Sequence, residues 1–555
     1  MNSPSPAQQT PAASTHDVVI MGGGLAGLTL ALQLRQRFPD LDVLVLERRA
    51  HPVPEACHKV GESTVEIGAH YFENVLGLKQ HLVDRQLKKF GFRFFFSDGR
   101  RDIAAVTEIG ASRPLPVASW QIDRGIFENF LGEEVQRQGA QFFDNASIRQ
   151  VELNGERGAV HTVHWQRPGQ APRTAQARWV VDACGRAGLL KRQLGLARDN
   201  AHPAHAVWFR VSGRIAIDEW SQDPAWQARC VTPTRWLSTN HLVGEGYWVW
   251  LIPLSSGSHS VGIVADPRWH PLEQMNSFER AMEWLQVHQP LLFDALDGKR
   301  DTLQDFAFFR RFSYDCEQVF SPQRWALAGE AGRFLDPFYS PGSDFIAISN
   351  TLICDLIGKD RAGKSFAAYA DIYQQLYFGF FDNTLTLYQD QYSLFGDAQV
   401  MPVKVIWDYT YYWALLAPLF CGEKLTDVSL LGRLRPQFER GRDLNLAMQA
   451  LLRSWGERNR AAQLPDAATL DGRLLDQFNI DWFHGMNRAL HDALDNPAFE
   501  QRIRDNVARM EWLAAETLQH ARASHSDIDG CGLDALLKDT TMERSLAAIW
   551  YATAA

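Results

Sequence analysis

The spacing of apolar and polar residues changes from segment to segment, and the first ordered pattern is the clearest. Residues 17–21 (DVVIM) form a run that is typical of a buried parallel strand. Helical periodicity follows over residues 28–38, and a second apolar run, residues 43–46, ends at Glu47. This pattern predicts strand, helix and strand, preceded by a disordered leader over residues 1–16 that is rich in Pro, Ser, Ala and Gln.

The turn between the first strand and the helix is rich in glycine. Gly22 permits a tight turn, Gly24 lets the backbone approach a pyrophosphate, and Gly27 lets the helix pack closely on the strand. The N–H groups at the start of the helix favour phosphate, and a carboxylate at Glu47 suits ribose hydroxyls. The segment therefore predicts a dinucleotide site made by Gly22, Gly24, Ala26, Gly27, Glu47 and Arg48.

Later segments differ in periodicity. Residues 201–300 alternate as strands, with one helix near residues 273–288, whereas the chain from about residue 344 onward is mostly helical. Aromatic residues crowd positions 372–395 and 403–419, either as core or as the lining of a pocket for an aromatic or lipid-like compound. The final amphipathic helices are compatible with capping the site, with forming a homodimer or with docking a carrier protein.

Composition narrows the class of protein. The 555 residues are 46% apolar and 22% charged, and the net charge of −9 argues against nonspecific nucleic-acid binding. The seven cysteines form no C-x-x-C pair and the histidines show no ligand spacing, so we expect no metal site and a reducing, cytoplasmic setting. Polar residues interrupt the most apolar stretch, residues 407–420, so we predict no membrane span. The N-terminus lacks the pattern of a signal peptide.

Two further strands end in small residues, at 179–186 and 325–332. They resemble the FAD-contacting strands of flavin monooxygenases, which implies that Gly329 and Glu330 contact the cofactor, although aspartate is the usual acid there. Arg124, which opens a helix, resembles a residue near the flavin phosphates in that group; a salt bridge at the helix start is the alternative. No second dinucleotide fingerprint is evident, so reduced flavin is expected to come from a separate reductase.

Two short motifs narrow the reactions that the chain could catalyse. Residues 248–253 read W-V-W-L-I-P, an alternating strand with two indoles on one face, and residues 334–342 read F-L-D-P-F-Y-S-P-G. Both resemble hallmarks of the flavin-dependent halogenases, and residues 61–64 resemble the flavin-responsive strap of that family. The resemblance implies that one set of residues lies beside the flavin, forms the halide site or flanks the internal tunnel that leads from the flavin to the substrate. These residues are Ser63, Trp248, Trp250, Pro253, Pro337, Ser340, Pro341, Gly342 and Ser343.

The resemblance implies an enzyme that uses FADH2, O2 and chloride or bromide to make hypohalous acid, which a lysine then captures. Lys89 matches the family spacing because it lies two residues before Gly91. If the segment is a strand, Lys88 points to the opposite face and Lys89 shares a face with Gly91 and Arg93. Lys59 is a weaker alternative.

The chain departs from tryptophan halogenases at Tyr339, where they carry a glutamate. A phenol can lose its own proton and needs that carboxylate less, so we expect a phenolic aromatic substrate, either free or tethered to a carrier protein. Asp344 is either a local base or, as the favoured interpretation, a helix N-cap. A single-component FAD-dependent aromatic hydroxylase and a noncatalytic FAD-binding protein are the alternative functions.

The predicted fold is α/β. Residues 17–350 form a Rossmann-like FAD-binding lobe of the flavin monooxygenase and halogenase type, interleaved with a mixed substrate sheet at about residues 201–300. Residues 351–555 form a mostly helical C-terminal extension, predicted as a substrate or cap region.

Overall fold

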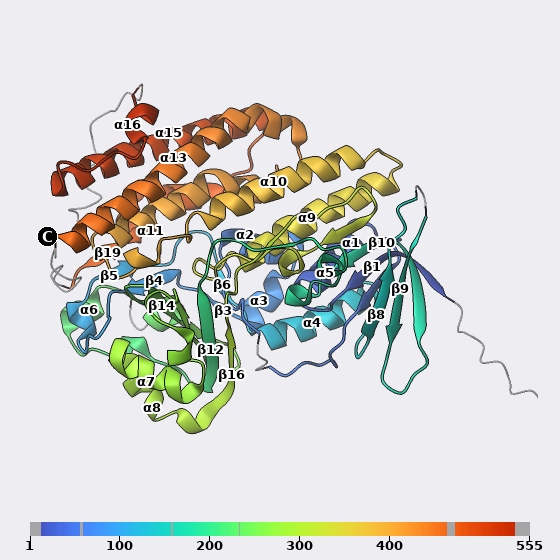
Figure 1. Cartoon of the computed structure of the whole chain (residues 1–555), viewed down its shortest axis with the longest axis horizontal. Helices are drawn as coiled ribbons and strands as arrows, with labels where there is room; N and C mark the ends of the chain where they lie inside the picture. The colour runs from blue at the N-terminus through green and yellow to red at the C-terminus, as the bar shows by residue number, and fades with distance from the viewer. Residues whose placement is uncertain (1–12, 56–58, 157–158, 232–233, 463–471, 539–555) are drawn as a thin grey trace, which may run out of the picture.

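The computed structural model describes residues 13–55, 59–156, 159–231, 234–462 and 472–538. Figure 1 shows two sheets side by side, with a layer of long helices across one side of the molecule. This arrangement confirms the predicted α/β fold with a helical C-terminal region.

The first sheet is built on the predicted buried strand. Val18, Val19, Ile20 and Met21 are fully buried, as a parallel strand covered on both faces requires. The strand begins at Ser14, so three residues of the expected leader belong to the sheet, and residues 1–12 lie outside the described chain. The strand order of this sheet is β7 (Gln141–Phe143), β2 (Val43–Leu46), β1 (Ser14–Met21), β10 (Arg173–Asp182), β9 (His161–Gln166) and β8 (Ser147–Glu152). Strand β18 (Trp325–Leu327) also pairs with β10.

Three helices cover this sheet and hold it against the rest of the chain. Helix α1 (Leu25–Arg37) packs against α4 (Arg124–Arg137) and against α9 (Gly342–Arg361). Asn350, in the middle of α9, donates to the carbonyl of Ala26 at 3.0 Å, so α9 packs beside the start of α1 although 324 positions separate the two residues.

The second sheet is wider than the sequence predicted. Residues 201–300 supply only its central strands, and the others come from distant segments. The order is β16 (Leu303–Phe309), β12 (His205–Ser212), β15 (Ser258–Ala265), β14 (Tyr247–Pro253), β13 (Thr239–Gly244), β4 (Phe92–Phe95), β5 (Glu108–Gly110) and β19 (Leu474–Asp476). The C-terminal extension thus contributes an edge strand to the sheet of the substrate lobe.

Two helices cover the outer face of the second sheet, as Figure 1 shows. Helix α7 (Phe278–His288) is capped by Ser277, whose hydroxyl accepts from the Arg280 amide at 3.3 Å, and it begins five residues later than predicted. Helix α8 (Pro290–Asp297) follows, and both pack into a core shared with β12, β14 and β15.

The C-terminal helices cover the inner side of the second sheet. The layer consists of α10 (Ala367–Leu385), α11 (Val400–Tyr411), α12 (Ala417–Cys421), α13 (Val428–Ala461), α14 (Asp481–Arg488), α15 (Asn496–Ser524) and α16 (Leu533–Leu536).

None of the helices in the described parts of the chain has the length and apolar composition that crossing a bilayer demands.

Candidate functional site

The glycine turn has the three properties that the sequence predicted. Gly22 adopts φ +110°, which residues with a Cβ rarely do. A Cβ on Gly27 would collide with the carbonyl oxygen of Gly22, so this close packing requires glycine. A Cβ on Gly24 would meet nothing within 4 Å, so this side of the turn is open. The open backbone at the start of α1 fits a pyrophosphate.

Glu47 lies at the end of β2 and is tied to the turn. One carboxylate oxygen accepts from the Gly23 amide at 2.7 Å and the other from the Arg49 amide at 2.8 Å. The side chain is therefore fixed beside the open turn, as a ribose-binding acid must be. The next residue, Arg48, is exposed.

The later flavin segments converge on the same region. Gly329 follows β18 and adopts φ +54°, and a Cβ there would lie 3.4 Å from that of Ala26. Burial raises the pKa of Glu330, while the cations of Arg186, Arg124 and Lys191 oppose the shift. A partly buried acid close enough to feel three cations fits contact with a polar cofactor chain.

Arg124 makes the helix-start ion pair that was the alternative interpretation. Its guanidinium donates to Glu128 at 2.6 Å, one turn along α4, and to the carbonyl of Val60 at 2.6 Å. Contact with the flavin phosphates stays a prediction.

A cavity of about 80 Å³, here called the flavin-side cavity, brings the predicted motifs together. Ile252 lines it together with Trp248 and Trp250, whereas Pro253, the next residue of β14, lies on the opposite face of the strand and does not line it. The predicted residues among its lining are Ser63, Trp248, Trp250, Gly329, Glu330, Pro337, Ser340, Pro341, Gly342 and Ser343.

Both indoles are fixed at the wall of this cavity. The Trp248 and Trp250 rings lie on the same face of β14, with centroids 5.7 Å apart. Trp248 donates to the hydroxyl of Tyr392 at 3.1 Å, and Trp250 donates to the hydroxyl of Ser260 at 3.1 Å. Because their N–H groups are satisfied, the rings present apolar faces to the cavity.

The loop before α9 suits an anion. Ser340 adopts φ +54°, and α9 begins two residues later at Gly342, so the first N–H groups of a 20-residue helix face the cavity wall. The Oγ atom of Ser343 is buried without a hydrogen-bond partner among the described residues. These donors fit the predicted halide position.

Lys89 is buried between two compartments. Its ammonium donates to Ser63 Oγ at 2.9 Å and to the carbonyl of Thr64 at 3.0 Å, and it lies 3.3 Å from the centroid of the Phe92 ring. Ser63 lines the flavin-side cavity, whereas Phe92 lines the larger cavity described below. The lysine therefore occupies the wall between them.

The predicted strand geometry around Lys89 is wrong. Strand β3 ends at Lys88, and Gly91 turns the chain at φ +83° before β4 begins. This turn brings Lys89 over Phe92 instead of placing it with Arg93. Lys88 is exposed and Lys59 pairs with Glu128, so neither shares the buried position of Lys89.

Two carboxyl groups lie near Lys89. Burial holds the pKa of Lys89 well below its usual value, although Glu66 and Asp344 oppose the shift. Burial also raises the pKa of Glu66. Lys89 and Glu66 line a small niche of about 20 Å³ beside residues 114–119. A depressed pKa lowers the free-energy cost of forming the unprotonated amine, which capture of an electrophile needs.

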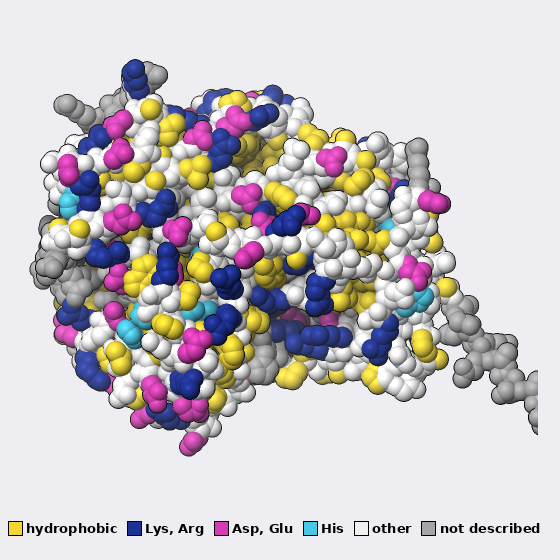
Figure 2. Space-filling view, viewed as in Figure 1, with side chains coloured by type: hydrophobic (Ala, Val, Ile, Leu, Met, Phe, Trp, Pro, Cys, Tyr) yellow, Lys and Arg dark blue, Asp and Glu magenta, His cyan; other side chains and the backbone are white. Residues whose placement is uncertain are grey.

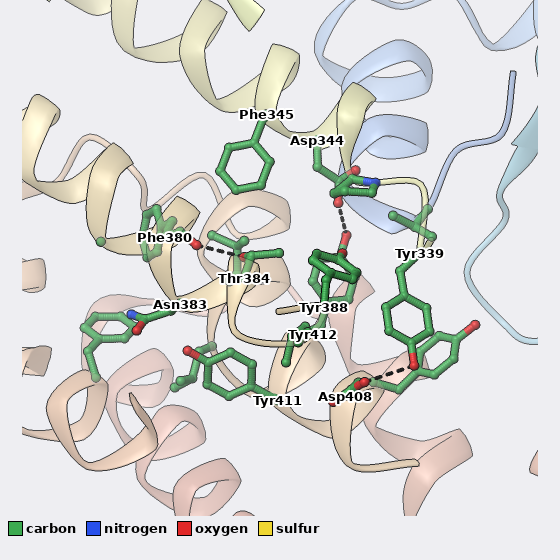
Figure 3. Close-up of a pocket in the computed structure, with 18 of the residues that line it drawn as sticks. Tyr339, Asp344, Phe345, Phe380, Asn383, Thr384, Tyr388, Asp408, Tyr411 and Tyr412 are labelled. Carbon is green, nitrogen blue, oxygen red and sulfur yellow. Dashed lines mark hydrogen bonds between the residues drawn. The ribbon is translucent and has the colours of Figure 1, made fainter. Parts of the chain in front are cut away.

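A larger cavity, here called the aromatic cavity, has a volume of about 210 Å³ (Figure 3). It shares Pro341 and Phe345 with the flavin-side cavity. Gln375 on α10 and Phe438 on α13 line its outer end, where Figure 2 shows apolar side chains recessed between these helices. Five tyrosines line it: Tyr339, Tyr388, Tyr409, Tyr411 and Tyr412. The aromatic-rich helices therefore line a pocket as well as forming core.

Asp344 lines this cavity but does not cap its own helix, contrary to the favoured prediction. The N-cap position of α9 is Pro341, and Asp344 is the third helical residue. Its carboxyl accepts from the Gly68 amide at 2.8 Å, in the first turn of α2 (Glu66–His70), and from Tyr412 at 2.7 Å. Asp344 thus caps α2. Burial raises its pKa to about 8.

Sequence reasoning missed a buried polar network on α11. Lys404 donates to Asp408 at 2.7 Å and to Gln449 at 2.8 Å, and Tyr339 donates to Asp408 at 2.9 Å. Asp408 is one of the polar residues that interrupt the apolar stretch over residues 407–420. Lys404 stands four residues before it, and this i, i+4 spacing of a lysine and an aspartate is the signal in the sequence.

The C-terminal extension also contacts Glu66, one of the two carboxyl groups near Lys89. Asn487 on α14 accepts from the Val117 amide at 2.9 Å and donates to Glu66 at 3.0 Å. Asn487 is fully buried. Capping of the site is therefore the contact that the structure shows for this region.

Together these residues fit FAD. The open turn at Gly24 offers backbone to the pyrophosphate, Glu47 is placed for the ribose, and the flavin-side cavity would hold the ring system. Bound flavin would supply the redox chemistry that protein side chains lack.

Comparison with known proteins agrees with this geometry. Residues 15–249 match the family described as FAD binding domain. The flavin-dependent halogenase chlA of Dictyostelium discoideum is 26% identical over 444 residues, which are 74% of this chain and 71% of that protein. The 1H-pyrrole-2-carbonyl-(peptidyl-carrier protein) chlorinase of Pseudomonas fluorescens is 27% identical, over 64% of this chain and 79% of that protein.

Solved structures share the fold. Halogenase PltM superposes with a TM-score of 0.62 at 18% identity, covering 88% of this chain and 99% of that chain. It has also been solved in complex with phloroglucinol and FAD. The flavin-dependent brominase Bmp2 superposes with a TM-score of 0.54 at 20% identity, over 68% of this chain and 87% of that chain.

Proposed function

The chain is a relative of the flavin-dependent halogenases in sequence and fold, and from this premise we propose that it halogenates a phenolic ring. Hypohalous acid would arise in the flavin-side cavity from FADH2, O2 and chloride or bromide, with FADH2 supplied by a separate reductase. It would pass Lys89 and meet the substrate in the aromatic cavity.

The position of Lys89 is the observation that carries this proposal. The lysine bonds to Ser63, which lines one cavity, and lies over Phe92, which lines the other. A buried amine on this wall is placed to take up an electrophile made on one side and present it on the other. Trp248 and Trp250 line the flavin-side cavity, where they would keep the substrate away from bound flavin and so disfavour direct oxygen transfer to the ring.

The lining of the aromatic cavity supports a phenol over free tryptophan. Among the described residues that line it, Asp344 and Asp408 carry the carboxyl groups, and neither lysine nor arginine is present. The carboxylate of an amino acid would therefore lack a cationic partner there, and its burial would be costly. A neutral hydroxylated ring with an apolar substituent suits aromatic walls that open between α10 and α13.

The test supplies the purified protein with FAD, a flavin reductase, NADH, chloride or bromide and a panel of phenols, with tryptophan as the comparison. We expect halide-dependent products from phenols and little from tryptophan, detected by mass spectrometry. Hydroxylated products, with NADPH oxidised by the chain alone, would favour the single-component hydroxylase. Bound flavin with neither product would favour a noncatalytic flavoprotein.

A further inference from the structure

Tyr339 is one of the polar residues that line the aromatic cavity, and its hydroxyl is hydrogen-bonded to the carboxyl group of Asp408. It donates to Asp408 at 2.9 Å, as Figure 3 shows. Both residues line the cavity. Tyr339 also belongs to the loop that leads through Ser340 into the flavin-side cavity, so it lies next to the path of the electrophile.

Two further hydrogen bonds fix the position of the Asp408 carboxyl group. Its Oδ2 atom accepts from Lys404 at 2.7 Å and its Oδ1 atom from Gln449 at 2.8 Å. Lys404 is fully buried and Asp408 is 2% exposed. Burial raises the pKa of Asp408, while Lys404, Gln449 and Tyr339 oppose the shift.

A buried ion pair is a costly way to build the wall of an apolar cavity. Desolvation of two charges offsets much of their attraction, and packed apolar residues would serve stability equally well. The network does fix the direction of one hydrogen bond. The Asp408 carboxyl accepts from Lys404, from Gln449 and from Tyr339, so the proton between Tyr339 and Asp408 lies on the tyrosine.

The tyrosine oxygen keeps its acceptor capacity because its proton is directed at Asp408. A ligand in the cavity thus meets a hydrogen-bond acceptor at Tyr339. A phenolic O–H satisfies this acceptor, whereas the methyl ether of the same ring has no proton to donate and leaves it unpaired.

We propose that Tyr339 binds the substrate hydroxyl and takes up its proton during halogenation, with Asp408 as the positioning residue that accepts the tyrosine proton. This inference rests on the proposed halogenation of phenols and names the group that recognises the hydroxyl. Asp408 stands on α11, so its carboxyl group acts on the substrate ring through Tyr339. It does not stand in the loop before α9, to which Tyr339 belongs.

The step balances in protons and electrons. The ring carbon opposite or beside the hydroxyl donates an electron pair to the halogen of hypohalous acid, and the halogen–oxygen bond breaks to release hydroxide. The phenolic proton moves to Tyr339 as the tyrosine proton moves to Asp408, which leaves a halogenated dienone. The ring C–H proton then leaves with hydroxide as water, and the relay returns its proton to the carbonyl oxygen. Phenol and hypohalous acid thus give halophenol and water.

The test compares resorcinol with 1,3-dimethoxybenzene in the wild type, Tyr339→Phe and Asp408→Asn. We expect each variant to halogenate resorcinol about 10²-fold more slowly, in the range of a lost general base. The rate with the dimethyl ether should change less than threefold. Equal losses on both probes would overturn the proposal, because they would indicate a packing role only.

The matched control is Tyr373→Phe. Tyr373 also donates to a buried carboxylate, Asp355, at 2.6 Å, but it lies outside both cavities. This variant should keep the wild-type ratio of the two rates. Tyr339→Phe removes one oxygen and leaves the Lys404–Asp408 pair intact, so it guards against misfolding of Asp408→Asn.

Equilibrium binding separates this inference from the proposed function. Calorimetry should show that Tyr339→Phe weakens resorcinol binding about tenfold and leaves the ether unchanged. This result would support hydroxyl recognition even if the wild type makes no halogenated product, which would count against the proposed function alone. Unchanged resorcinol binding in Tyr339→Phe would overturn the recognition by Tyr339.

Discussion

The Nζ atom of Lys89 lies 2.9 Å from the Oγ atom of Ser63, and this bond joins the two compartments of the site. Ser63 also shares a hydrogen bond of 2.9 Å with Thr239. Both hydroxyls line the flavin-side cavity. The serine therefore fixes the lysine from the side on which the oxidant would form.

Replacing Ser63 by alanine should remove one of the hydrogen bonds that hold the Nζ atom of Lys89 and leave the lysine itself in place. We expect Ser63→Ala to oxidise FADH2 at the normal rate, to release more free hypohalous acid and to make several-fold less halophenol. The ratio of product to oxygen consumed measures this effect. Ser97→Ala is the control, since Ser97 is equally buried and bonds to Gln289 at 2.7 Å outside the cavities. An unchanged ratio in Ser63→Ala would remove the serine from this role.

Two glycine substitutions should separate cofactor binding from folding. A Cβ on Gly24 meets open space, whereas one on Gly27 collides with the carbonyl of Gly22. We therefore expect Gly24→Val to fold and lose bound FAD, and Gly27→Val to be strongly destabilised. Flavin absorbance after gel filtration and thermal unfolding measure the two effects. Normal FAD content in Gly24→Val would contradict the placement of the pyrophosphate.

The raised pKa of Asp344 predicts a pH-dependent stability difference. Its pKa rises from the usual 3.8 to about 8 on burial, so the unfolded chain loses this proton at lower pH than the folded chain. The contribution to stability is present below about pH 4 and is lost as pH rises towards 8. Asp344→Asn should therefore gain unfolding free energy relative to the wild type across this window. Urea titrations at pH 5 and 8 measure the change, and equal differences at both values would contradict it.

Asn487 tests whether the C-terminal extension serves the site. Asn487→Ala leaves the buried carboxylate of Glu66 without this donor, so we expect a loss of about 1–3 kcal/mol of unfolding free energy. We also expect less halophenol per flavin oxidised. Asn129→Ala is the control, because Asn129 similarly bridges the backbone of Val53 at 2.7 and 2.8 Å on the FAD side. Equal product yields in both variants would limit Asn487 to a structural role.

Local patterns predicted the geometry of the glycine turn and of its neighbouring strands. The glycine turn, the buried strand and Glu47 follow each other in the sequence, so one short segment predicts their geometry. The paired indoles of Trp248 and Trp250 followed in the same way from the period of a strand.

The substrate side depends on contacts between distant residues, which spacing alone does not reveal. The strand period around Lys89 failed because Gly91 turns the chain and moves the lysine over Phe92. Asn487 approaches Glu66 across 421 positions, and no local signal marks that contact. Asp408 was visible in the sequence, but its partner Tyr339 became evident only from the packing of α11.

The role of Lys89 is the central claim, and one paired comparison tests it. Lys89→Ala and Lys88→Ala are incubated with reductase, NADH, FAD, halide and resorcinol, and halogenated product is quantified by mass spectrometry beside oxygen consumption. We predict that Lys89→Ala loses product by at least ~10²-fold while it still oxidises flavin, and that Lys88→Ala, altered at an exposed side chain, stays near the wild type. Wild-type product yield from Lys89→Ala would contradict the account.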